Sequence, residues 1–189
     1  IIADIKRLNE KSSNPIVLQI HSPGGGVLPG AKLIGVMEAS KAPIYTVCTG
    51  VCASMAAMIH GHGAKRYGLD RAILMYHPAS GGAQGQVRNM LSQLTTVNNY
   101  IEKMVGHIVG SSKMTQDEFQ KVVAYELWID SEDALAKGLN DAVVALNVPS
   151  HPERALTLEA PPGEEQVGPT TPVTLNVAAV VNVLLDTAV

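Results

Sequence analysis

The stretch IVLQIHSPGGGVL, residues 16–28, carries the clearest fold signal in the chain. Residues 16–21 form a short apolar run, the pattern of a strand that is buried on both faces of a parallel sheet. Residues 24–26 are three glycines, which indicate a sharp turn where the backbone can closely approach another group. The pattern predicts a strand, a glycine turn and then a helix. That helix is expected to bury Leu28, Leu33, Val36 and Met37.

The same alternation continues on both sides of this stretch. Residues 44–48 read as a second strand, residues 53–59 as a helix of small residues, and residues 71–76 as a third strand. Ile1, Ile2, Ile5 and Leu8 have helical spacing ahead of the first strand. Because the connections are long enough for right-handed crossovers, the order predicts an α/β fold with parallel strands.

The second half of the chain is predicted to be helical before its composition changes. A long helix is expected from Val87 to about Val109, a shorter one after the capping pattern of residues 115–118, and another over residues 130–138. Proline-rich segments follow, so we divide the chain into a domain over residues 1–148 and a linker and C-terminal tail over residues 149–189. The apolar end of that tail is short and interrupted for a membrane span.

Composition excludes several classes of protein. The chain has 189 residues and a formal net charge of −3, which is not the basic footprint of a nucleic-acid binder. With 46% hydrophobic and 16% charged residues, it is not a disordered chain. Two cysteines suit a reducing compartment, and no secretory signal is visible. Aromatics are scarce at 4%, so the core must be built from aliphatic residues and close backbone packing.

Three features could carry chemistry. Ser54 lies where a strand should turn into a helix, near free N–H groups that favour an oxyanion; as an isolated feature, a helix-capping serine is the simpler interpretation. The Gly24–Gly26 turn could supply further N–H groups, or be an ordinary turn. His77 follows a strand at its carboxyl end, where it could be a general base or a structural histidine.

Two other groups of residues could suggest a metal site. His60 and His62 form a His-x-His pair, but the spacing names no third ligand, and we assign no metal from the sequence. Cys48 and Cys52 lack the partners of a zinc site and are interpreted as small buried residues.

The order of these motifs resembles the proteolytic subunit of the Clp protease over about residues 1–144. Ser22-Pro23-Gly24-Gly25 is followed by Ala53-Ser54-Met55-Ala56, and then by Met75-Tyr76-His77-Pro78 and the specific string over residues 81–86, GGAQGQ. The resemblance implies the spiral of β-β-α units that this family shares with crotonases, here without the N-terminal strand. It also implies a serine endopeptidase that needs no cofactor.

By this resemblance Ser54 is the nucleophile and His77 the base, with the amides of Gly25 and Met55 as oxyanion donors. Residues 81–86 match the segment of the family that forms a strand and the start of a helix, through which two subunit rings pair. The family's acid aligns with Glu126, and Asp130 is the alternative. A Glu can still accept the imidazole N–H and hold its tautomer.

Two departures favour the branch of the family that viruses of bacteria use in head maturation. The axial loops that face the ATPase partner are missing from this sequence, and Glu126-Leu127-Trp128 with the proline-rich tail is closer to the viral relatives. The resemblance thus implies peptide or protein substrates, a homo-oligomeric ring, and capsid or scaffold proteins or an AAA+ unfoldase as partners. We expect a cytoplasmic location, in the host or the assembling virion if a phage encodes the chain, and no nucleic-acid or membrane partner.

Two other functions remain open at this stage. A crotonase-like acyl-CoA enzyme would share the topology but rely on Glu acid and base residues. A non-catalytic ring or scaffold subunit would keep Ser54 only as a helix cap, and the distance between Ser54 Oγ and the His77 ring separates it from the peptidase.

Overall fold

The computed structural model describes residues 1–147, 157–159, 173–174 and 180–183. The helices are α1 (Ile2–Lys11), α2 (Val27–Glu38), α3 (Met55–Gly61), α4 (Val87–Gly110), α5 (Gln116–Val123) and α6 (Ser131–Ala136). The strands are β1 (Ile16–Ser22), β2 (Ile44–Ala53), β3 (Lys65–Leu69), β4 (Ile73–Tyr76), β5 (Leu127–Asp130), β6 (Ala142–Asn147), β7 (Thr157–Glu159), β8 (Val173–Thr174) and β9 (Val180–Val183).

Strand β2 organises the sheet by changing partner along its length. It runs parallel to β1, while residues 45–48 also pair with β3 and residues 51–53 pair with β4. Strand β4 then pairs antiparallel with β5, and β3 pairs parallel with β6. Because β2 pairs with β3 near its start and with β4 near its end, the sheet is curled. The α/β fold of strand and helix units predicted from the sequence is confirmed.

The two faces of β1 belong to different parts of the core. Ile16, Leu18 and Ile20 join the main cluster, which includes buried residues of α1, α2 and α3. Val17 points to the other face and packs with Val47, Tyr67 and Val144. This alternation follows from the period of two in a strand. The start of the strand is therefore buried on both faces, as its apolar pattern predicts, while Gln19 is half-buried and His21 is exposed on the face that carries Val17.

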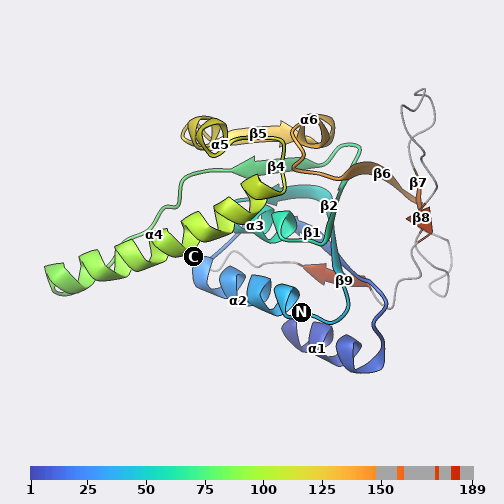
Figure 1. Ribbon diagram of the computed structural model, residues 1–189, viewed down its shortest axis with the longest axis horizontal. Coiled ribbons are helices and arrows are strands. Elements are labelled where there is room, and N and C mark those ends of the chain that lie inside the picture. Colours follow the sequence, from blue (N-terminus) through green and yellow to red (C-terminus); the bar gives the residue numbers. More distant parts are fainter. Residues whose placement is uncertain (148–156, 160–172, 175–179, 184–189) are drawn as a thin grey trace.

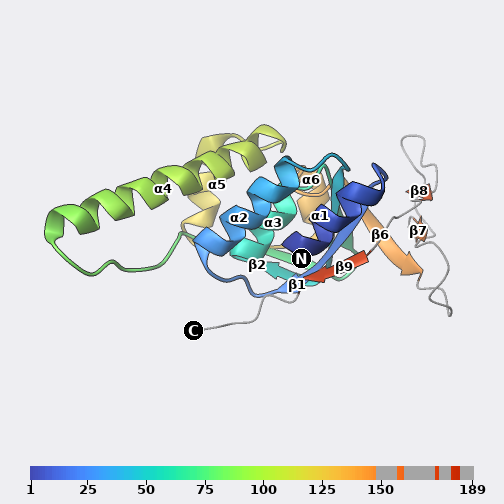
Figure 2. The ribbon, with the colours of Figure 1, turned by 90° about the horizontal axis from the view of Figure 1, so that it is seen from below.

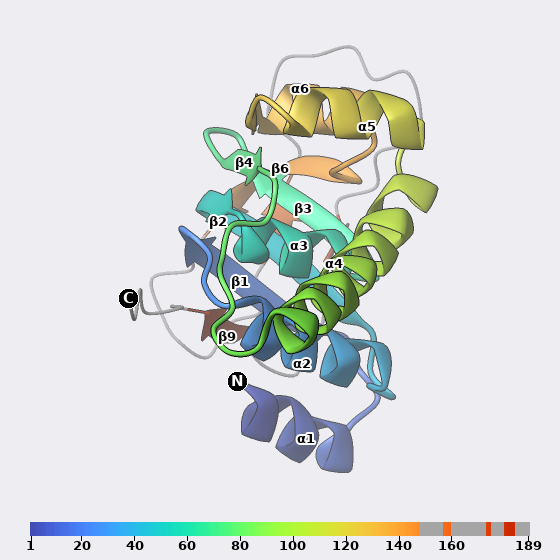
Figure 3. The same cartoon turned by 90° about the vertical axis from the view of Figure 1, so that its left-hand side faces the viewer.

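Helix α4 extends well beyond the rest of the domain (Figures 1 and 2). Only its C-terminal half contributes fully buried side chains, Met104 and Ile108. Helices α5 and α6 lie at the opposite end of the molecule from α1 (Figure 3). Thr115 and Glu118 form a reciprocal capping box at the start of α5, which confirms the helix start predicted there.

Leu28 is a prediction that was wrong, since its side chain is 68% exposed. The buried positions of α2 include Gly30, Leu33, Ile34 and Met37. At 3.6 residues per turn, Leu28 falls on the opposite side of the helix from them. The apolar side chain of Leu28 therefore does not mark a core position.

Strand β3 was not predicted, because Lys65 and Arg66 make its sequence resemble a loop. Arg66 is nevertheless buried, and its guanidinium donates to both carboxylate oxygens of Asp141, at 2.8 and 3.2 Å. It also donates to the hydroxyl and carbonyl of Ser111 beyond α4. The Arg66 charge is accommodated within the sheet because Asp141, which lies 75 residues further along the chain, pairs with it.

The segment between β4 and α4, residues 77–86, contains no regular secondary structure. The strand that the resemblance implies for residues 81–86 is therefore absent from the single chain. Most of the predicted linker and tail lies outside the described residues, although β7, β8 and β9 pair with β6, β7 and β1. Across the residues the structure describes, none of the helices is both long and apolar enough to cross a lipid bilayer.

Candidate active site

Ser54 occupies the junction between β2 and α3 in a backbone conformation that is unusual for a residue with a side chain. Its φ is 56° and its ψ −124°. Such a conformation costs on the order of 1–3 kcal/mol and persists only where neighbours impose it. The Ser54 N–H donates to the Met75 carbonyl at 2.8 Å, which ties the junction to β4. The hydroxyl makes no capping hydrogen bond, so the helix-cap interpretation is wrong.

Gly24 is needed beside this junction for steric reasons. Its φ is +112°, and a Cβ placed there would lie 2.7 Å from Ser54 Cβ and 2.8 Å from the Ala53 carbonyl oxygen. The preceding loop is held by Ser22, whose buried hydroxyl accepts the Gly24 N–H at 3.1 Å. The glycine turn therefore packs directly against the Ser54 backbone.

His77 meets Ser54 because β2 and β4 end side by side. The parallel register pairs Ala53 with Met75, which places the residues that follow each strand at the same edge of the sheet. A hydrogen bond of 2.7 Å joins Ser54 Oγ and His77 Nε2. This distance is the contact expected between a nucleophile and its base, and it is not the wide separation expected of a non-catalytic subunit.

The pairing of β4 with β5 places Glu126 near His77, but the two side chains form no hydrogen bond. The antiparallel register pairs Tyr76 with Leu127, so His77 and Glu126 stand one step beyond that pair. Glu126 is exposed, with a positive φ of 62°, and its carboxylate accepts the Trp128 indole N–H at 3.4 Å. Among the described residues, His77 has a hydrogen bond only to Ser54.

Asp130, the alternative acid, is engaged elsewhere. It pairs with Ile73, at the other end of β4 from His77. At about 3.4 Å per residue, this separates the two by roughly 14 Å along the strand. Its carboxylate accepts the Asp133 N–H at 2.8 Å and caps α6.

The two predicted oxyanion donors belong to residues that line the same site. Gly25 and Met55 line one pocket together with Ser54 and His77. Met55 is the first residue of α3, so its N–H has no acceptor within the helix. Neither N–H donates to another group in the part of the chain that the structure describes. They are free to donate to an oxygen beside Ser54.

The pocket beside Ser54 is apolar and has a volume of about 120 Å³. Its walls come from α3, α4 and α5, and include Met58, Met104, Val105, Phe119 and Val123. No carboxylate lines it, so the Glu acid and base of a crotonase-like enzyme have no counterpart here. An apolar side chain would fit beside the serine.

These pocket walls were missed by the sequence interpretation. Phe119 is the only phenylalanine of the chain and is fully buried in α5, where it packs edge-to-face against Tyr76 at 5.3 Å. A lone Phe in an amphipathic helix signals burial but not which surface it covers. Only the packing of α5 against α4 places it in the pocket.

The remaining candidates are structural or lie apart from this site. His60 is fully buried, with its Nε2 2.8 Å from Asn140 Oδ1, and burial lowers its pKa to about 4. Among the described residues, His62 clusters with Glu38 and His107 and not with His60, so the His-x-His pair does not converge on one ion. Cys48 and Cys52 are free and buried, as predicted, and burial raises the pKa of the Cys52 thiol well above its usual value.

A comparison with known protein families gives one match over most of the chain. The family model described as Clp protease matches residues 1–147. The matched region runs from α1 through β6 and contains Ser54, His77, Glu126 and both amide donors.

Proposed function

The chain belongs to the Clp protease family of peptidases, and on this premise we propose that it is a serine endopeptidase with Ser54 as nucleophile and His77 as general base. The observation that carries the proposal is the 2.7 Å hydrogen bond between Ser54 Oγ and His77 Nε2. It forms at the carboxyl ends of β2 and β4, beside a pocket that Gly25 and Met55 also line.

The reaction follows from these positions. Ser54 Oγ attacks the peptide carbonyl carbon while His77 Nε2 takes the hydroxyl proton. The carbonyl oxygen becomes an oxyanion that accepts from the Gly25 and Met55 amides, a type of donor whose loss typically costs about 10²–10³ in rate. His77 then returns the proton to the leaving amine, and water hydrolyses the acyl-enzyme by the same route.

Glu126 is proposed to orient His77. Support comes from the β4–β5 register, which puts Glu126 beside His77 and leaves Asp130 capping α6. In this role the Glu126 carboxylate would turn away from Trp128 and accept the N–H of His77 Nδ1. This hydrogen bond would fix the tautomer in which Nε2 can accept the serine proton.

The acid can be tested with a matched pair of variants. Glu126→Gln is expected to lower kcat/KM by about 10²–10⁴, because the imidazolium loses its charged partner. Asp130→Asn is the control and should leave kcat/KM within about threefold. The assignment is wrong if Asp130→Asn removes activity and Glu126→Gln does not.

The pocket indicates which peptides to assay. We expect cleavage after apolar residues, because the pocket beside Ser54 presents methionine, valine and phenylalanine side chains and no charge. Peptides that differ only in the residue before the scissile bond, Leu against Asp, give the measurement. A preference for Asp would contradict this part of the proposal.

Assembly into paired rings is proposed from the exposed part of α4. Val87, Leu91 and Leu94 recur at helical spacing and are 66%, 60% and 47% exposed. An apolar stripe on a protruding helix is suited to a contact with another copy. Leu91→Lys is expected to reduce the native mass in gel filtration, whereas Asn89→Lys, on the opposite side of the helix, should not. An unchanged mass in both would exclude this contact.

The viral branch remains the favoured biological setting. The supporting features are Glu126-Leu127-Trp128 and the proline-rich composition after residue 148. We propose capsid or scaffold proteins as substrates, in the cytoplasm of the host, rather than delivery by an AAA+ unfoldase. Neighbouring portal and capsid genes are the expected finding, and an adjacent unfoldase gene would contradict it.

A further inference from the structure

His62 is a buried histidine that the peptidase mechanism does not use. It follows α3 directly, and only 1% of its side chain is exposed. Its Nδ1 lies 2.8 Å from the Met58 carbonyl oxygen and donates its proton to it. That hydrogen bond leaves Nε2 as the unprotonated nitrogen, and a backbone carbonyl bonded to one ring nitrogen is the usual support of a metal-binding histidine.

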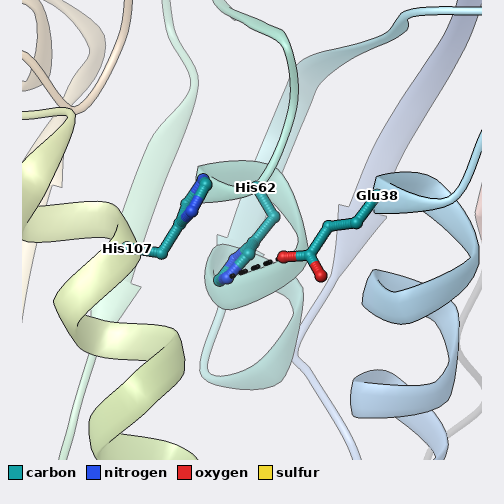
Figure 4. Close-up of side chains that lie close together, drawn as sticks. All are labelled: Glu38, His62 and His107. Carbon is teal, nitrogen blue, oxygen red and sulfur yellow. Dashed lines mark ion pairs between the residues drawn. The ribbon is translucent and has the colours of Figure 1, made fainter.

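Two further donor groups surround this ring, as Figure 4 shows. The carboxylate of Glu38 lies 4.0 Å from His62 Nε2. The imidazole of His107 stacks on that of His62, with ring centroids 4.5 Å apart and planes 11° from parallel. One ligand atom from each of the three residues lies within 4.8 Å of the others.

The three residues come from the C-terminal ends of three helices. Glu38 is the last residue of α2, His62 caps α3, and His107 lies in the last turn of α4. Each helix end carries a partial negative charge from its unpaired carbonyl groups. Their convergence, together with the Glu38 carboxylate, makes an electrostatic environment that favours a cation.

We propose that Glu38, His62 and His107 bind a divalent transition-metal ion, with Zn²⁺ as the favoured class. Two imidazoles and one carboxylate are a ligand set typical of zinc, and water can fill a fourth tetrahedral position. Magnesium and calcium prefer sets made of oxygen alone.

Binding an ion requires Glu38 and His107 to rearrange, which their exposure permits. Ligands at about 2.0–2.1 Å from a tetrahedral zinc stand roughly 3.4 Å from one another. Glu38 therefore has to move toward His62 by less than 1 Å. The lone pair of an imidazole nitrogen lies in the plane of its ring, so the His107 ring also has to turn out of its stacked arrangement before both rings can face one ion. Both side chains are exposed, whereas His62 is held in place by burial and by its bond to Met58.

The ion would join the helices that shape the peptidase pocket. Helix α2 begins just after the glycine turn, α3 begins just after Ser54, and α4 supplies Met104 to the pocket wall. Fixing their C-terminal ends would stabilise the arrangement of the pocket without touching the reacting groups. The site is thus a structural metal site, distinct from the Ser54–His77 pair.

The test uses the purified protein and the metal alone. Stripped wild-type protein is titrated with ZnCl₂ and its Tm is measured, alongside Glu38→Gln and His107→Gln. These variants alter exposed side chains, so they keep the fold. Glu10→Gln and His21→Gln are the controls, since they remove one exposed carboxylate and one exposed imidazole elsewhere. Co²⁺ is added in parallel to read the coordination geometry from its visible absorption.

A rise in Tm of about 5–10 °C is expected for wild type at a 100-fold excess of Zn²⁺ over its dissociation constant. The controls should show the same rise. Glu38→Gln and His107→Gln should bind at least tenfold more weakly, and should lose the tetrahedral Co²⁺ absorption of the wild type. An absent Tm rise in wild type, or an equal rise in all five proteins, would overturn the proposal.

Discussion

Replacing Gly24 with alanine should damage both the fold and the nucleophile. Gly24 sits at φ +112°, where a residue with a Cβ is strained by about 1–3 kcal/mol. The new Cβ would lie 2.7 Å from Ser54 Cβ, 2.8 Å from the Ala53 carbonyl oxygen and 3.1 Å from the Met55 nitrogen. Two of these atoms are backbone, so the contact cannot be relieved by rotating a side chain.

The expected magnitude combines strain and overpacking. Forcing an extra methyl group into a packed site costs about 1–3 kcal/mol, which gives a total of about 2–6 kcal/mol with the backbone strain. Partial relief by moving Ser54 is the cheapest response, so the stability loss should fall at the lower end, about 2–4 kcal/mol. A displacement of about 1 Å at the nucleophile costs roughly 10² in rate.

The assay pairs urea denaturation with the rate of fluorophosphonate labelling at Ser54. Gly35→Ala is the matched control, because a Cβ at that exposed position of α2 meets nothing within 4 Å. It should raise the free energy of unfolding by about 0.5–1 kcal/mol and leave labelling unchanged. If Gly24→Ala unfolds within about 0.5 kcal/mol of wild type and is labelled at the same rate, the steric argument for the glycine turn is refuted.

Three further predictions concern the ion pair, the strained serine and the α5 cap. Asp141→Asn should cost about 2–4 kcal/mol in urea unfolding, because it leaves the buried Arg66 guanidinium without its partner, whereas the exposed Asp70→Asn should cost little. Burial raises the pKa of Asp141, but the hydrogen bonds and charge of Arg66 outweigh it and hold the pKa below its usual value. Its stabilisation is therefore complete above about pH 4 and lost as the pH falls further, and the acid part of the stability–pH curve should flatten in Asp141→Asn. Ser54→Gly should be about 1 kcal/mol more stable than Ser54→Ala in thermal unfolding, since glycine relieves the positive φ; equal stabilities would argue against strain at Ser54. Thr115→Ala should lower the free energy of unfolding by about 0.5–2 kcal/mol through loss of the capping box, and an unchanged urea midpoint would show that the cap is dispensable.

Local signals made much of the fold and part of the site predictable. The glycine turn, the small residues around Ser54 and the strand before His77 each have a signature within a few residues of the chain. The parallel pairing of β2 with β4, which these local signals do not specify, brings Ser54 and His77 to the same edge of the sheet. The family resemblance supplied the pairing of roles that no single motif indicates.

The features that were missed depend on contacts between distant residues. Strand β3 is charged and reads as a loop until Asp141 is seen to pair with Arg66. The cluster of Glu38, His62 and His107 exists only because three helices end at one point, and no spacing in the chain encodes it. The side chain of Glu126 likewise bonds to Trp128, a contact that alignment to a family motif does not predict.

The central claim is that His77 activates Ser54 for attack on a carbonyl. Its most direct measurement is the labelling of the purified protein by a fluorophosphonate, with the adduct located by mass spectrometry. We predict a single adduct on Ser54, lost in Ser54→Ala and formed at least about 10³-fold more slowly in His77→Ala. An unlabelled Ser54, or labelling that proceeds at the same rate without His77, would contradict the account.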